Sequence, residues 1–126
     1  MRTVMSIIFV FAAVLSLAVF TSNSLENSSK LLSKDLSTIS DEINAENWHQ
    51  ALAKTKKFEQ DWDKVNYWWP MVMDHLEIDH IEFNLARVKE YIRAQNSDLA
   101  LGELSMLKKI IDHIPENDKL NLKNIL

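Results

Sequence analysis

An apolar run at the N-terminus constrains this chain more than any other feature of its sequence. From Thr3 to Phe20 there is no charged residue, and most of the run is Val, Ile, Phe, Leu and Ala. Its 18 residues approach the ~20 that an α-helix needs to cross the hydrocarbon of a bilayer. We therefore expect residues 1–23 to form a transmembrane anchor or a signal segment, in contact with membrane lipid through residues 3–20.

The residues after the run favour an anchor that is not cleaved. A cleaved signal normally has a shorter apolar stretch and small side chains at its exit, whereas Phe20 stands here, followed by the polar residues Ser22, Asn23 and Ser24. Only Arg2 and the amino terminus precede the run with positive charge. We expect a single-pass protein of the cell membrane with a cytoplasmic N-terminus and an extracytoplasmic remainder. Secretion after signal cleavage stays open as the alternative.

The remainder of the chain has the pattern of amphipathic helices. It has one Gly and two Pro, so there is little material for the turns of a β-rich fold. Apolar residues recur at spacings of three and four, which is the helical period. Four blocks show this spacing: Leu25 to Ile43, Trp48 to Trp69, Ile78 to Ile92, and Ala100 to Ile114. We expect helix breaks at Pro70 and Pro115, and an N-cap at Ser97.

These blocks predict an all-α fold, with an N-terminal transmembrane (signal-anchor) helix followed by a small antiparallel bundle of three to four helices. Residues 24–44 form either a helical stalk or the first bundle helix, and residues 45–126 form the extracytoplasmic helical domain. The first stripe could also pair with a second copy of the chain. A homo-oligomer therefore stays open.

Composition and motifs exclude several classes of function. Beyond the apolar run there are 13 basic and 18 acidic residues, a balance that disfavours nucleic acid as a partner. The chain has no cysteine, which removes disulfides, thiolate zinc sites and cysteine nucleophiles. Its serines lack a glycine-rich elbow, and Gly102 stands alone inside a helical pattern. We expect no enzymatic activity and no cofactor.

Acidic and histidine residues gather in the third block. On a helix, His75, Asp79 and Glu82 share one flank, a spacing that can direct several ligands toward one metal ion. A chain reversal near Asn96 would place His113 across from His80 and beside Glu77, so that these three could also approach one ion. The same pattern is typical of a solvated helix face with histidine–carboxylate pairs. We assign no metal site, and a metal-binding or pH-sensing domain that uses His75, Asp79, Glu82 or His113 remains the alternative.

The aromatic residues before Pro70 are the second candidate feature. Trp68 and Trp69 are adjacent, so they cannot both face the core of one helix. An exposed Trp beside a groove is a frequent anchor for a protein partner. These rings could instead form a core hinge, because large rings commonly fill the space where two helices turn back on each other. The hypothesis that we carry forward is that a membrane or extracytoplasmic protein binds here. The predicted surface comprises Trp68, Trp69, Asp74, His75, Glu77, Asp79 and His113.

Several of these motifs also carry a resemblance to a known family. They are Trp68-Trp69, the run from Asp74 to Asp79, Arg87 with Tyr91-Ile92, His113-Ile114, and the closing Leu122 to Leu126. The chain resembles the uncharacterised bacterial family catalogued as domain of unknown function 4363, found in spore-forming Firmicutes. The resemblance implies a short protein with one N-terminal membrane segment and a helical extracytoplasmic part that works beside other membrane proteins. It implies no activity, and we expect an interaction or accessory module.

Overall fold

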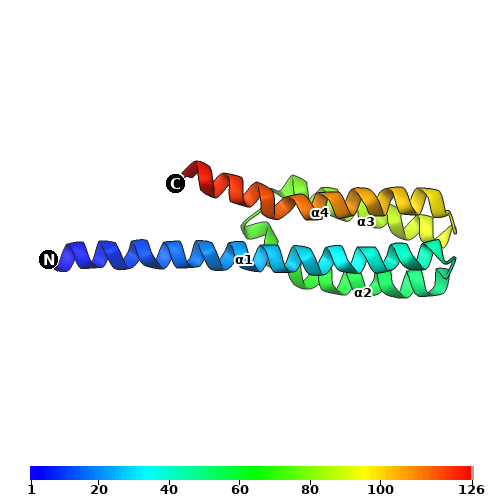
Figure 1. The fold of residues 1–126 in the computed structure, drawn as a ribbon, viewed down its shortest axis with the longest axis horizontal. Coiled ribbons are helices and arrows are strands. Elements are labelled where there is room, and N and C mark those ends of the chain that lie inside the picture. The colour runs from blue at the N-terminus through cyan, green and yellow to red at the C-terminus, as the bar shows by residue number, and fades with distance from the viewer. Residues whose placement is uncertain (126) are drawn as a thin grey trace.

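The protein is a bundle of four α-helices, one of which is much longer than the bundle (Figure 1). This computed structural model describes residues 1–125, apart from the side chains of 118, 120–122 and 125. The helices are α1 (Arg2–Asn44), α2 (Trp48–Asn66), α3 (His75–Arg93) and α4 (Ser97–Ile125), with a short 3-10 helix η1 (Trp69–Met71) between α2 and α3. No strand occurs in residues 1–125, so the predicted all-α fold is confirmed.

The long helix α1 combines two parts without a break. Its first part extends away from the other helices (Figure 1). This part contains an 18-residue window with a mean hydropathy of 2.6, long and apolar enough to cross a membrane, and none of the window is buried. Its second part, from Leu25 to Ile43, buries one apolar stripe. Residues 24–44 therefore lie inside the bundle as its first helix.

The core lies along the bundle axis, where each helix presents one apolar face. Helix α1 packs against α2 and α4, and α3 packs against the same two helices. Helical spacing places the buried residues in one stripe per helix, and burial of each large apolar side chain contributes about 1.5–3 kcal/mol. The largest fully buried side chains are Trp69, Phe58, Leu25, Leu32, Leu36, Ile39, Ile43, Ile81, Ile92, Leu104, Leu107 and Ile111.

Two similar loops close the end of the bundle far from the N-terminus. Residues 45–47 join α1 to α2, and residues 94–96 join α3 to α4. The middle residue of each loop has a left-handed backbone, with φ of 58° at Glu46 and 56° at Gln95. In both loops the third residue donates its backbone N–H to a carbonyl of the preceding helix at 2.9 Å. These bonds satisfy helix-end carbonyls that would otherwise lack partners.

The start of α4 differs from the sequence-based expectation by one residue. The side-chain oxygen Oδ1 of Asn96 accepts a hydrogen bond from the backbone N–H of Leu99 at 3.1 Å. Ser97 is the first residue of the helix. The predicted N-cap at Ser97 is therefore wrong, because Asn96 is an equally good capping residue and lies where the loop ends.

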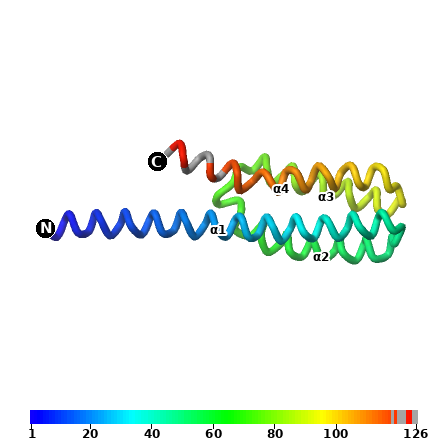
Figure 2. Tube along the Cα trace, in the orientation of Figure 1, coloured from blue at the N-terminus to red at the C-terminus, as the bar shows by residue number. Residues whose placement is uncertain are grey.

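The expected break at Pro115 is also wrong, because α4 continues through it to Ile125. Proline has no N–H, so the carbonyl of Ile111, four residues earlier, loses its helical partner. The hydroxyl of Ser29 replaces that partner, donating to the Ile111 oxygen at 2.7 Å in a buried position. A serine of α1 therefore accommodates the proline of α4. Up to this point α4 runs alongside α1 (Figure 2).

Candidate functional site

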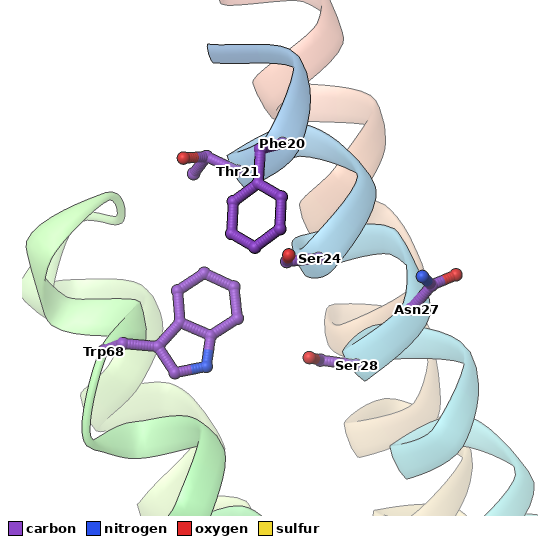
Figure 3. Close-up of a pocket in the computed structure, with 6 residues that line it drawn as sticks. All are labelled: Phe20, Thr21, Ser24, Asn27, Ser28 and Trp68. Carbon is purple, nitrogen blue, oxygen red and sulfur yellow. The ribbon is translucent and has the colours of Figure 1, made fainter. Parts of the chain in front are cut away.

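The α2–α3 connection comes near α1 at the end of the bundle from which the apolar part of α1 extends (Figure 1). A cleft lies between them. Its volume is about 540 Å³. The rings of Phe20 and Trp68 face each other across it, and the hydroxyls of Ser24 and Ser28 point toward Trp68 (Figure 3). The lining residues are Phe20, Thr21, Ser24, Asn27, Ser28 and Trp68. The cleft thus combines aromatic walls with hydroxyl groups from one face of α1.

The two adjacent tryptophans have different environments. Trp69 is fully buried, and its ring meets Trp62 edge to face, with centroids 5.5 Å apart. Trp68 is half-buried and meets Trp69 edge to face at 6.3 Å. Edge-to-face pairs of this kind contribute about 0.5–1.5 kcal/mol beyond burial. Trp69 is therefore a core residue that holds Trp68 in place, and Trp68 is the one a partner could reach.

The polar residues predicted for the same surface lie mainly at the start of α3. Asp74 is the N-cap of α3, and its Oδ1 accepts from the N–H of Leu76 at 3.1 Å. Glu77 is a second acid in the first turn, where the positive end of the helix dipole favours it. His75 and Asp79 are exposed. These residues begin the helix that follows the α2–α3 connection, and Asp74 caps its start. Of the predicted surface, only Trp68 is among the residues that line the cleft.

The four residues considered for metal binding are not brought together. Within the described residues there is no group of three or more His, Cys, Asp and Glu side chains that could hold a metal ion. Glu82 instead accepts a hydrogen bond from Asn66 at 3.1 Å. His113, on α4, pairs through Nδ1 with Glu116 at 3.1 Å. Both contacts are ordinary surface interactions.

The structure contains an ionic cluster that the sequence did not single out. Lys57 of α2 contacts Asp35 of α1, with Nζ to Oδ1 at 3.1 Å, and Asp61 of α2, with Nζ to Oδ2 at 2.7 Å. Asp35 is buried. Each member immediately precedes a core residue of its helix: Leu36, Phe58 and Trp62. A charged residue directly before a core residue is therefore the only sign of this cluster in the sequence. It predicts the ion pairs only when the alignment of α1 against α2 is known.

Burial and the contact with Lys57 shift the pKa values of the two carboxyl groups in opposite directions. Desolvation raises the pKa of Asp35, and the neighbouring Asp61 raises it further. The hydrogen bond from Lys57 lowers the pKa of Asp61, and the same bond raises the pKa of Lys57. The two acids therefore share one cation unequally. The cluster joins α1 to α2 and lies away from the cleft lining.

These features define a class: a small four-helix bundle whose first helix includes a candidate membrane span. The chain belongs to the family described as Domain of unknown function (DUF4363), whose sequence profile matches residues 19–125. The resemblance seen in the sequence is thereby confirmed at the level of the family. The match begins at the last residues of the apolar run and covers the cleft and the whole bundle. No curated protein and no solved structure matches the chain.

Proposed function

We propose that this protein is a membrane-anchored, non-enzymatic interaction module that binds another membrane protein at the extracytoplasmic face of a bacterial membrane. The observation that carries the proposal is the continuity of α1. An unburied apolar window and a buried bundle stripe belong to one helix. The bundle and its cleft are therefore attached directly to the anchor, without a flexible linker.

The exposed apolar part of α1 supports the anchoring role. An 18-residue run rises about 27 Å as a helix, close to the ~30 Å of a bilayer's hydrocarbon core. Soluble proteins rarely leave so large a continuous apolar surface in water. The exposed side chains of this part include Val4, Met5, Ile7, Ile8, Phe9, Val10, Phe11, Val14, Leu15, Leu17, Val19 and Phe20.

The cleft supports the interaction role. Trp68 is partly accessible and is held by a buried ring behind it, so binding would order little that is not already ordered. Ser24 and Ser28 supply hydrogen-bonding groups on a helix face beside it, and such residues are common where membrane helices meet. Because Phe20 both ends the apolar run and lines the cleft, the partner is expected to emerge from the membrane at this level.

Crosslinking in intact cells tests the proposal, with mass spectrometry of what stays with the full-length protein after detergent extraction. We compare Trp68→Ala with Trp48→Ala, because Trp48 is also half-buried but begins α2 at the opposite end of the bundle. One membrane partner should be lost with Trp68→Ala and retained with Trp48→Ala, while thermal unfolding shows that both variants are folded. Retention of the partner by Trp68→Ala, or equal loss with both variants, would contradict the proposal.

A further inference from the structure

The two ends of the bundle have opposite surface chemistry. The loops at the far end, residues 45–47 and 94–96, read Ala-Glu-Asn and Ala-Gln-Asn. The connection at the near end, from Tyr67 to Met73, reads Tyr-Trp-Trp-Pro-Met-Val-Met and has no charged residue. A loop facing water normally carries polar turn residues, as the two far loops do. The near connection therefore lacks the composition of a loop that faces water alone.

Three of the seven side chains of this connection, those of Tyr67, Met71 and Val72, are exposed to solvent. The exposed fraction is 82% for Tyr67, 78% for Met71, 42% for Val72 and 63% for Leu76, at the start of α3. Among the side chains that the structure describes, the other exposed large apolar residues of the bundle are spread over its helices: Leu31, Leu52, Phe83, Leu99 and Met106. The concentration at one end is what distinguishes an interaction surface from ordinary scatter.

The level of the connection relative to the anchor indicates what covers it. Trp68 and Phe20 line the same cleft, so the connection lies level with the last residue of the apolar run. If that run crosses the hydrocarbon, the connection lies where hydrocarbon gives way to headgroups. Trp and Tyr are enriched in this layer, because their rings are apolar and their N–H or O–H groups are polar.

We propose that the α2–α3 connection is a second membrane contact, in which Tyr67, Met71, Val72 and Leu76 insert into the interfacial layer of the lipid bilayer. The inference rests on the anchoring part of the proposed function. It adds that the bundle meets the membrane at two places, which fixes its orientation. Asp74 and Glu77 begin α3 beside the connection, so apolar burial, and not attraction to anionic headgroups, drives the contact.

Single cysteines test this contact, because the chain has no cysteine of its own. Full-length Met71→Cys, Val10→Cys and Ala94→Cys variants are labelled with a small environment-sensitive fluorophore and placed singly in phosphatidylcholine nanodiscs. Quenching is then measured with lipids that carry a nitroxide near the headgroup or deep in the acyl chain. We expect shallow nitroxides to quench the label at Met71 severalfold more than the label at Ala94. Deep nitroxides should quench the label at Val10 most.

Each outcome assigns the failure to one step. If Val10 is quenched and Met71 is no more quenched than Ala94, the anchor stands and the second contact is overturned. If neither is quenched, the anchor itself fails. Quenching of Met71 only after phosphatidylglycerol is added would overturn an apolar contact. The emission of the label at Met71 could instead shift only when several proteins share one disc, with no quenching by nitroxide lipids. That result would show that a second copy of the chain covers this surface, and it would overturn the contact with lipid.

Discussion

The two parts of α1 are made of similar apolar residues but distribute them differently. Before Phe20 the apolar side chains face every direction and are exposed, whereas from Leu25 to Ile43 they form one buried stripe with polar residues between. The first pattern fits a helix surrounded by lipid, and the second fits a helix with water on one side and protein on the other. One uninterrupted helix is therefore suited to two different environments.

This difference explains why the cleft lies where it does. The polar residues Thr21, Ser24, Asn27 and Ser28 occupy the transition between the two parts. They follow the apolar run and lie next to the first buried residues of the stripe. The α2–α3 connection reaches the same level, and the cleft forms between them. Substitutions in each part of α1 can therefore be compared directly, since they should affect different properties of the protein.

The largest expected effect concerns the apolar part. Lys at Val10 and at Val14 together should prevent stable membrane insertion, because each lysine at the centre of a span costs about 2.5–3.5 kcal/mol. Resistance of the protein to alkaline extraction from membranes measures this. The control is Leu31→Lys, an exposed position of the bundle part of the same helix. Loss of insertion with the control as well would remove the distinction between the two parts.

The next largest effect concerns the buried stripe. Ile39 is fully buried, and Ile39→Ala should lower the free energy of unfolding by about 2–5 kcal/mol, since it removes apolar contacts and leaves a cavity. Chemical denaturation of the protein in nanodiscs measures this. Leu17→Ala, in the exposed part, should leave unfolding of the bundle unchanged. Equal destabilisation by both would mean that residues before Phe20 also pack in a protein core.

The hydroxyl of Ser29 should have a smaller but specific effect. Ser29→Ala leaves the Ile111 carbonyl without a partner and should cost about 1–3 kcal/mol, whereas Ser40→Ala removes only a hydroxyl bonded to its own helix at 3.3 Å. In a Pro115→Ala background the new backbone N–H can serve that carbonyl. The cost of Ser29→Ala should then shrink, and a double-mutant cycle measures the difference. An unchanged cost would show that Ser29 does not compensate for the proline.

The smallest effect concerns the two acids between α1 and α2. Burial raises the pKa of Asp35 in the folded protein, so the charged form of this carboxyl lowers the stability of the fold at pH 7. Asp35→Asn removes the charge and should therefore raise the thermal midpoint at pH 7. Lys57 lowers the pKa of Asp61 in the folded protein. Asp61 therefore stabilises the fold at pH values above its pKa in the unfolded chain, and this stabilisation is lost in acid. Asp61→Asn should therefore lower the midpoint at pH 7, and both differences should fade on acidification. A shift of the thermal midpoint in the same direction for both variants would contradict this assignment.

Much of the fold was predictable because helical spacing depends on local sequence. The apolar stripes, the absence of strands and the break near Pro70 all follow from residues near one another in the chain. Pro115 was misread because the group that compensates for it, the hydroxyl of Ser29, lies 82 residues from Ile111, whose carbonyl it serves. Whether residues 24–44 form a stalk or the first bundle helix was open for a similar reason. An apolar stripe alone does not show which surface packs against it.

The candidate site was predictable only in part. Adjacency showed that Trp68 and Trp69 must differ, but only the packing of Trp69 against Trp62 shows which one is buried. The wall formed by α1 was missed, because Phe20 and Ser24 meet Trp68 only when α1 and the α2–α3 connection come together. Proximity along one helix left a metal site at His75, Asp79 and Glu82 open as an alternative, yet no side chain described on another helix completes it.

An accessibility scan along α1 tests the central claim most directly. Single spin-labelled cysteines at successive positions from Met5 to Asp41 would be compared for collision with oxygen, which dissolves in lipid, and with a water-soluble nickel complex. We predict high oxygen access on every face up to Phe20, followed by alternation of water-exposed and buried positions with a helical period. A helical period of water exposure before Phe20 would contradict the claim that α1 passes from lipid into the bundle.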